Sequence, residues 1–83
     1  QTTIDRFVFD NKIKKIAFIK ADIEGMERDL LRGAGKTIKK FKPKISVCIY
    51  HRPDDPEIIE GILKRNVPEY KIKKTGTKLY AWI

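Results

Sequence analysis

The sequence predicts an α/β fold in which a mixed sheet holds two parallel strands and a C-terminal antiparallel hairpin. Two apolar runs, within residues 15–23 and 44–51, have the length of strands and are bounded by charged residues. Apolar residues recur at helical spacing between the runs, and a crossover through helices makes two strands parallel. Near the C-terminus, two strand-like runs flank Thr75-Gly76-Thr77, a short connection that is typical of a hairpin.

The N-terminal element is a short helix. Thr3 has the hydroxyl of a common N-cap residue, and Ile4, Phe7 and Val8 after it share one helical face. This helix should close near residues 10–11.

The first strand, within residues 15–23, has its apolar centre at residues 16–19. A continuous apolar run of this kind is typical of a strand buried on both faces, as in a parallel sheet. The helical spacing that follows, over residues 26–41, is interrupted at Gly33 and Gly35, so we expect two short helices there.

Pro43 ends that helical segment, and the second strand follows within residues 44–51. Asp54 or Asp55 before Pro56 predicts the start of a further helix, because proline suits the first helical turn and acids favour its positive end. The helix should stop before Val67.

The chain has 83 residues, which is a single-domain length with one compact core. Its 19 Lys and Arg residues against 11 Asp and Glu residues give a net charge of +8. Solvated surface lysines account for most of this charge. The alternative is a small basic α/β module that binds nucleic acid or another protein.

Cys48 is the single cysteine, so an intrachain disulfide is excluded, and a reducing, cytoplasmic location is the simplest expectation. Its place inside an apolar strand predicts a core role rather than a nucleophile. No apolar run approaches the ~20 residues of a membrane span, so no membrane partner is expected.

The candidate site lies where the two parallel strands end, because ligands of open parallel sheets bind outside the carboxyl ends of strands. Asp22, Glu24 and Glu27 follow the first strand, and His51 and Arg52 follow the second. Parallel neighbours bring these groups to one rim of the sheet.

Each of these residues has two interpretations. The carboxylates could orient a hydroxyl, an ammonium or a metal ion, but Glu24 and Glu27 also suit a helix N-terminus. His51 could act as a general base, or it could simply hydrogen-bond to its loop. Arg52 could reach an anionic substrate, or it could be a solvated surface residue.

The sequence motifs of several other kinds of site are absent. A glycine-rich phosphate loop, a paired-histidine metal motif and a nucleophile elbow are all missing, so no metal site is predicted. Tyr50, Tyr70, Tyr80 and Trp82 fall mostly within strand runs, where packing explains them. Nucleic acid is therefore not the expected partner.

Five stretches in order resemble FkbM-type methyltransferases, and together they span nearly the whole chain. The stretches are Thr2-Thr3-Ile4-Asp5-Arg6-Phe7, Phe18-Ile19-Lys20-Ala21-Asp22-Ile23-Glu24-Gly25-Met26-Glu27, Leu31-Arg32-Gly33-Ala34 to Lys42-Pro43, Ile49-Tyr50-His51-Arg52-Pro53-Asp54, and Val67-Pro68-Glu69-Tyr70. The acidic block Asp-Ile-Glu-Gly-x-Glu, in this order, is fairly specific for the family.

The resemblance implies that residues 1–83 are one partial domain, the C-terminal half of a Rossmann-like class I methyltransferase fold. The cofactor would be S-adenosylmethionine. The family's glycine-rich cofactor loop and the acidic residue for the ribose belong to strands that this sequence lacks, so the chain alone should neither bind the cofactor nor transfer methyl groups. The connection at residues 75–77 is short where relatives often carry a longer loop, which puts substrate contacts there in doubt.

Carried over residue by residue, the resemblance places Asp22 and Glu24 beside the methionine end of the cofactor and His51 before the acceptor. It implies O-methylation of a sugar or small-molecule hydroxyl. Asp22 and His51 are the expected catalytic residues, while Glu24, Glu27, His51 and Arg52 are expected to contact the acceptor. An apolar sheet edge beside residues 16–19 would favour self-association.

Overall fold

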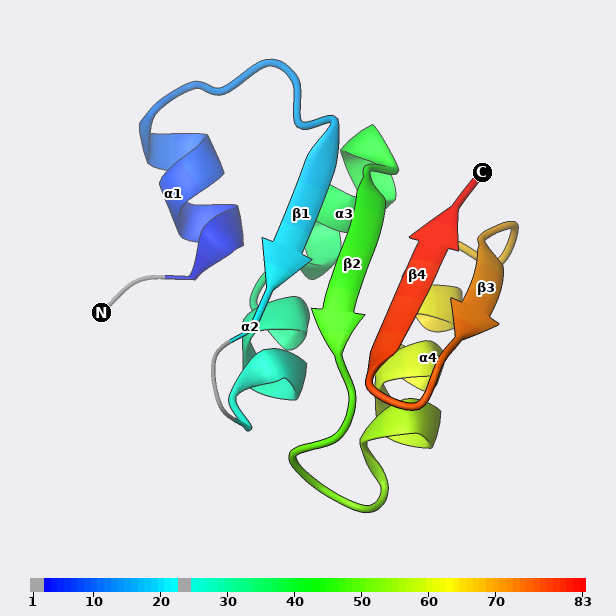
Figure 1. The fold of residues 1–83 in the computed structure, drawn as a ribbon. Coiled ribbons are helices and arrows are strands. Elements are labelled where there is room, and N and C mark those ends of the chain that lie inside the picture. The colour runs from blue at the N-terminus through cyan, green and yellow to red at the C-terminus, as the bar shows by residue number, and fades with distance from the viewer. Residues whose placement is uncertain (1–2, 23–24) are drawn as a thin grey trace.

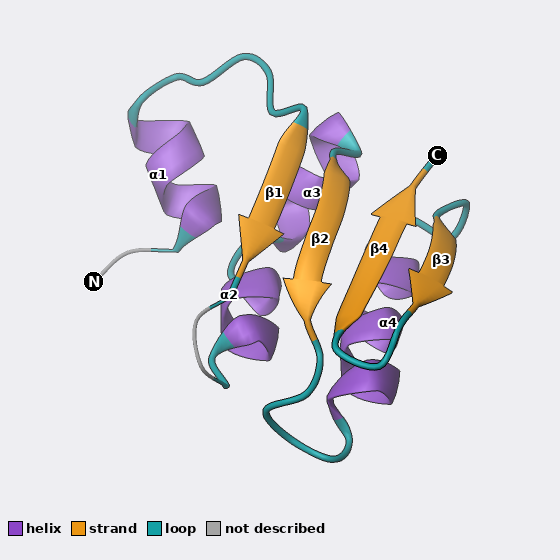
Figure 2. Cartoon of the chain, viewed as in Figure 1, coloured by secondary structure: helices purple, strands orange, loops and turns teal. Residues whose placement is uncertain are grey.

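The computed structural model describes residues 3–22 and 25–83, which form a four-stranded sheet with helices packed against it (Figures 1 and 2). The elements in chain order are α1 (Ile4–Asp10), β1 (Phe18–Ala21), α2 (Glu27–Arg32), α3 (Gly35–Phe41), β2 (Lys44–Cys48), α4 (Asp55–Asn66), β3 (Lys71–Lys74) and β4 (Lys78–Trp82). None of these helices is long and apolar enough to cross a membrane.

The sheet has the strand order β1-β2-β4-β3. β1 runs parallel to β2, with Ile19 opposite Ile45, and β4 runs antiparallel to both β2 and β3. The predicted parallel pair and C-terminal hairpin are therefore confirmed. β1 and β3 are the two edges of the described sheet.

One face of the sheet carries the core. Helices α2, α3 and α4 lie behind this face in Figure 1. Most of the strand residues that face these helices are buried, and they include Ile19, Ala21, Ile45, Val47, Leu79 and Ala81. Buried aliphatic residues of the helices pack in the same cluster, among them Leu31, Ile38, Ile59 and Leu63. We call this side the covered face.

No helix of the described residues lies over the opposite side of the sheet (Figure 2). Side chains alternate between the two faces of a strand, so the register assigns a second set of residues to this side. We call it the open face, and it comprises Phe18, Lys20, Lys44, Ser46, Cys48, Lys71, Lys73, Lys78, Tyr80 and Trp82. Five of its members are lysines.

The predicted first strand is wrong in two respects. β1 spans only four residues, and its burial alternates, so Phe18 is 58% exposed and Lys20 is also exposed. The physical reason is that β1 is an edge strand with helices on one side only. β2, which lies between β1 and β4, is buried on both sides from Ile45 onward.

The packing predicted for the aromatic residues also needs correction. Tyr70 is buried, but Tyr50 and Tyr80 are 55% and 37% exposed. Tyr50 lies two residues after the end of β2, and Tyr80 lies on the open face. Their strand-like surroundings in the sequence therefore did not imply burial.

The helix predictions are confirmed. Thr3 caps α1 by accepting a hydrogen bond from the backbone N–H of Arg6 at 3.1 Å. α2 and α3 are separate short helices divided at Gly33 and Ala34. α4 begins at Asp55 with a proline in its first turn and ends at Asn66.

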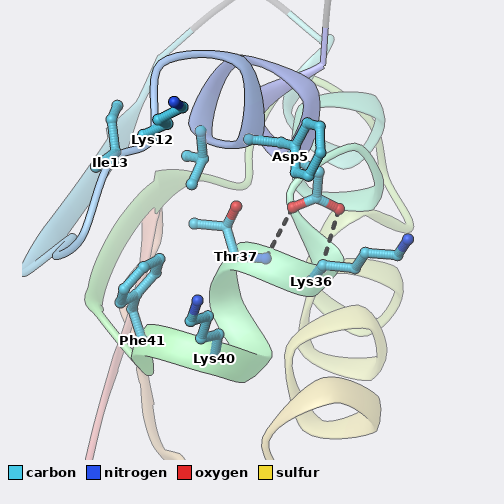
Figure 3. A pocket seen from close by; sticks show the side chains of 9 residues that line it. Asp5, Lys12, Ile13, Lys36, Thr37, Lys40 and Phe41 are labelled. Atoms are coloured by element: carbon cyan, nitrogen blue, oxygen red, sulfur yellow. Dashed lines mark hydrogen bonds between the residues drawn. The ribbon is translucent and has the colours of Figure 1, made fainter.

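Two helices that are distant in sequence are joined by one carboxylate. The side chain of Asp5, on α1, accepts hydrogen bonds from the backbone N–H groups of Lys36 and Thr37 at 2.9 and 2.8 Å (Figure 3). These groups lie in the first turn of α3, where backbone donors lack partners inside the helix. Asp5 therefore caps α3 from outside.

Candidate functional site at the ends of the parallel strands

The carboxyl ends of β1 and β2 lie side by side, because Ala21 is paired with Val47. Asp22 directly follows β1, and His51 lies three residues after the end of β2. β1 and β2 end on the same side of the sheet in Figure 1. The predicted meeting of Asp22 and His51 at this rim is thus found in the structure.

Three side chains converge at the rim. His51 Nε2 lies 3.5 Å from Asp22 Oδ1 and 3.5 Å from Glu27 Oε2, and the three groups offer one ligand atom each within 4.8 Å of one another. Asp22 is 58% exposed, His51 is 18% exposed and Glu27 is fully buried. The cluster therefore reaches from the interior to solvent.

The Nε2 atom of His51 is shielded from solvent and has no hydrogen-bond partner among the described residues. Separations of 3.5 Å are too long for hydrogen bonds to nitrogen, which are usually ~2.7–3.2 Å. The ring of His51 also packs against the ring of Tyr50, with a centroid distance of 4.1 Å and an angle of 35° between the ring planes. The imidazole is therefore oriented by packing, with Nε2 directed toward the two carboxylates.

Glu27, the first residue of α2, is more deeply placed than a helix-start acid usually is. Its Oε1 accepts a hydrogen bond from the backbone N–H of Gly25 at 3.0 Å, while Oε2 is the oxygen near His51. Burying a carboxylate is costly unless opposite charge lies nearby. A protonated imidazole or a bound cation at this position would stabilise it.

The turn that returns Glu27 to the rim depends on Gly25. Its φ angle is +93°, a conformation that residues with a Cβ rarely adopt. A Cβ built there would lie 3.8 Å from the Cβ of His51, which is an ordinary contact. Backbone conformation, rather than lack of space, therefore selects glycine.

An ion-pair cluster fixes the loop that carries His51. Arg28 on α2 donates to Asp55 Oδ1 at 3.0 and 2.7 Å and to Asp54 Oδ1 at 2.6 Å. These hydrogen bonds raise the pKa of Arg28 and lower the pKa of Asp54. Asp55, which is buried, also accepts the backbone N–H of Arg52 at 3.1 Å. The starts of α2 and α4 are thereby joined beside the rim.

Cys48 is buried at the end of β2, as predicted from its apolar surroundings. Burial, together with the neighbouring Asp22 carboxylate, raises the pKa of its thiol. A thiol with a raised pKa is a poor nucleophile, because the thiolate is the reactive form.

The predicted site residues thus fall into three groups. Asp22, Glu27 and His51 are brought together. Arg52 lies next to them in the chain, and it is exposed. Glu24 lies outside the described residues.

The sequence did not reveal that Arg28 joins the two loops. Its partners are 26 and 27 residues away, and no local pattern links them. The available signal in the sequence was the adjacent pair Asp54 and Asp55. One acid is enough to favour a helix start, so the second acid indicated another partner.

A pocket of about 360 Å³ lies elsewhere, between α1 and α3 (Figure 3). Its lining combines apolar groups with the side chains of Lys12, Lys36 and Lys40 around Asp5. None of the three rim residues contributes to it, so it is separate from the candidate site.

Comparison with known proteins places this geometry in a family. The model of the methyltransferase FkbM domain matches residues 1–70. The crystal structure of methyltransferase FkbM from Methylobacillus flagellatus KT is similar at 33% identity and a TM-score of 0.72, over 87% of this chain and 22% of that chain. This chain therefore spans about a fifth of the length of that protein. No curated protein matches it. Because the family model covers most of the chain, the protein belongs to the FkbM methyltransferase domain family.

Proposed function

We propose that this chain forms the acceptor side of the active site of an S-adenosylmethionine-dependent O-methyltransferase that acts on a sugar or small-molecule hydroxyl. The observation that carries the proposal is the approach of His51 to Asp22 and Glu27 at the ends of the parallel strands. The membership of a methyltransferase family supplies the reaction class.

The chemistry requires an aligned hydroxyl and a group that takes its proton. The acceptor oxygen attacks the methyl carbon, a new C–O bond forms, and the C–S bond breaks with its electron pair moving to sulfur. The hydroxyl proton must leave as the oxygen becomes positive, and a positioned base contributes ~10²–10⁴-fold to such steps. Asp22, with its exposed carboxylate beside the oriented imidazole of His51, suits this task.

The cofactor supplies the activated methyl group when it is bound. Asp22 at the rim could accept hydrogen bonds from the amino end of such a ligand. Affinity for nucleotide-containing cofactors depends largely on a glycine-rich turn and an acidic partner for the ribose. Residues 1–83 contain no such turn. We therefore expect that calorimetry of this chain with S-adenosylmethionine will detect no micromolar binding. Micromolar binding by a monomer would contradict the interpretation that the cofactor site in this chain is incomplete.

The test of transfer uses a chimera in which this chain replaces the matching part of the Methylobacillus flagellatus protein. Methyl transfer from labelled S-adenosylmethionine is measured against a panel of sugars and hydroxylated small molecules. Asp22→Asn and His51→Gln should each slow transfer at least tenfold, which is about 1.4 kcal/mol in the barrier, with little change in melting temperature. Asp29→Asn, at an exposed site on α2, is the matched control. Normal turnover in both rim variants would refute the assignment.

Binding of single-stranded nucleic acid is a second candidate function, and the open face supports it. Five lysines share this face with Phe18, Tyr80 and Trp82, and none of the strand residues is acidic. Lysines that neutralise phosphates beside aromatic rings that stack on bases are the usual elements of such surfaces.

Affinity for a fluorescent oligonucleotide at increasing salt tests this candidate, since log K should fall with a slope of about −0.7 per neutralised phosphate. Lys20→Gln and Tyr80→Ala on the open face should weaken binding, whereas Lys64→Gln on α4 should not. Absence of binding near ~50 mM salt would eliminate the candidate, because phosphate contacts are strongest at low salt.

A further inference from the structure

We propose that Asp22, Glu27 and His51 bind one divalent metal ion. The protein ligands would be Nε2 of His51 and one oxygen from each carboxylate, which are the three atoms that the fold brings within 4.8 Å. The three residues come from the end of β1, the start of α2 and the loop after β2, so the site is assembled by tertiary structure.

The two separations between His51 Nε2 and the carboxylate oxygens fit a metal better than they fit hydrogen bonds. Ligands at ~2.0–2.2 Å from a common ion are separated by about 2.8–3.1 Å when neighbouring bonds make octahedral angles and by about 3.3–3.6 Å when they make tetrahedral angles. His51 Nε2 lies 3.5 Å from each of the two carboxylate oxygens. Both separations fall within the tetrahedral range, and both exceed hydrogen-bond length.

The second, independent observation concerns the hydrogen bonding of His51 Nε2. This atom is shielded from solvent and makes no hydrogen bond to any described residue, although buried polar atoms nearly always have a partner. An N–H at Nε2 would be expected to donate to one of the carboxylates at ~2.7–3.2 Å. A shielded ring nitrogen that lies 3.5 Å from two carboxylate oxygens instead suits a metal ligand.

The burial of Glu27 points the same way. Its side chain is fully buried, and Oε1 is oriented by the backbone N–H of Gly25, which leaves Oε2 on the side of His51. Ligating carboxylates are commonly oriented by such additional hydrogen bonds. The positive charge of an ion would also stabilise the buried carboxylate.

One nitrogen and two carboxylate oxygens suit Mn²⁺, Co²⁺ or Zn²⁺. Three protein ligands leave coordination positions free, as in catalytic metal sites, and the exposed Asp22 marks the side that is open to solvent. Adjacent oxygens of a vicinal diol could occupy those positions. A cation lowers the pKa of a bound hydroxyl and orients it. This role in the reaction rests on the proposed methyl transfer, whereas binding of the metal does not.

Binding is measured by titrating the 83-residue chain with Mn²⁺ and following the paramagnetic resonance signal of the free ion. One ion per chain is expected. Asp22→Asn and His51→Gln should each weaken binding at least tenfold. Asp29→Asn removes one exposed carboxylate from α2 outside the cluster and should leave binding unchanged. The net charge of +8 disfavours nonspecific cation binding, which makes the stoichiometry informative.

The melting temperature provides a second test of metal binding. Mn²⁺ or Zn²⁺ should raise the melting temperature of the original chain, because a ligand that binds only the folded state stabilises it. The same ions should not raise the melting temperature of the rim variants. Absence of one-to-one binding at millimolar Mn²⁺ and Zn²⁺, or equal weakening by Asp29→Asn, would overturn the metal site.

The two proposals can fail separately. If the chimera still transfers methyl groups after all metal has been chelated, the methyltransferase assignment stays intact. The ion then has no catalytic role. One-to-one binding that depends on His51, in a chimera that transfers no methyl group, would support the metal site and refute the proposed function.

Discussion

The two faces of the sheet differ in composition and in burial. The covered face is aliphatic and packs against three helices, whereas the open face carries five lysines with aromatic residues among them. Both faces are built from the same strands, and on β4 the buried Leu79 and Ala81 alternate with Lys78, Tyr80 and Trp82. The apolar core of the domain therefore lies mainly on one side of the sheet, although Ser46 and Cys48 on the open face are also buried.

The largest expected effect comes from neighbouring substitutions on β4. Leu79→Ala should lower the free energy of unfolding by about 2–5 kcal/mol, because Leu79 is fully buried and its truncation leaves a cavity. Tyr80→Ala, one residue away on the open face, should cost less than about 1 kcal/mol. Urea unfolding measures both values. Equal losses would mean that the open face is covered in solution.

A smaller effect is expected for a charged group within the helix layer. Arg28→Met should lower the free energy of unfolding by about 1–3 kcal/mol, because Asp55 is buried and would lose its charged partner. The control is Arg32→Met on the same helix. Arg32 forms only an exposed pair with Asp29, so its loss should cost at most about 1 kcal/mol.

The pH dependence of the Arg28 effect has a definite sign. Because Arg28 lowers the pKa of Asp54, the pair stabilises the fold above the unfolded-state pKa of Asp54 and loses this stabilisation as the pH falls through the folded-state pKa. The difference in melting temperature between the original chain and Arg28→Met should therefore narrow in acid. A constant difference at all pH values would contradict the assignment.

The smallest effect contrasts a buried phenol with an exposed one. Burial, together with the neighbouring Glu69, raises the pKa of Tyr70 to about 12 from a usual value of 10.0. Because the unfolded chain ionises first, stability should fall as the pH rises between these two values. Tyr70→Phe should remove this decline, while the loss of its hydrogen bond to the carbonyl of Pro43 costs about 0.5–1.5 kcal/mol.

Thermal unfolding between pH 9 and 12 would follow the decline, with Tyr80→Phe as the control on the open face. An equally steep alkaline loss in Tyr70→Phe would show that another group is responsible.

Much of the fold was predictable because each element carries a local signal. Thr3, the break near Gly33 and the proline at the start of α4 mark helix boundaries whatever the rest of the chain does. The one-sided burial of β1 was not predictable, because an apolar run does not reveal how many faces of its sheet are covered.

The candidate site was also predictable in part. The rule that parallel strands end at one rim placed Asp22 beside His51. The depth of Glu27 follows from the backbone turn at Gly25, and residue spacing does not encode that turn. The link from Arg28 to Asp55 depends on two helices packing together, so only tertiary structure reveals it.

The attachment of α1 has a consequence for the dynamics of the domain. None of its residues is buried, and the Asp5 carboxylate that caps α3 is one of its attachments to the rest of the domain. Such a segment opens by local fluctuation at a free energy well below that of global unfolding. Each opening of α1 would also release the amide groups of Lys36 and Thr37. Fraying at the start of α3 is therefore coupled, through a single side chain, to the motion of a helix about thirty residues earlier in the chain.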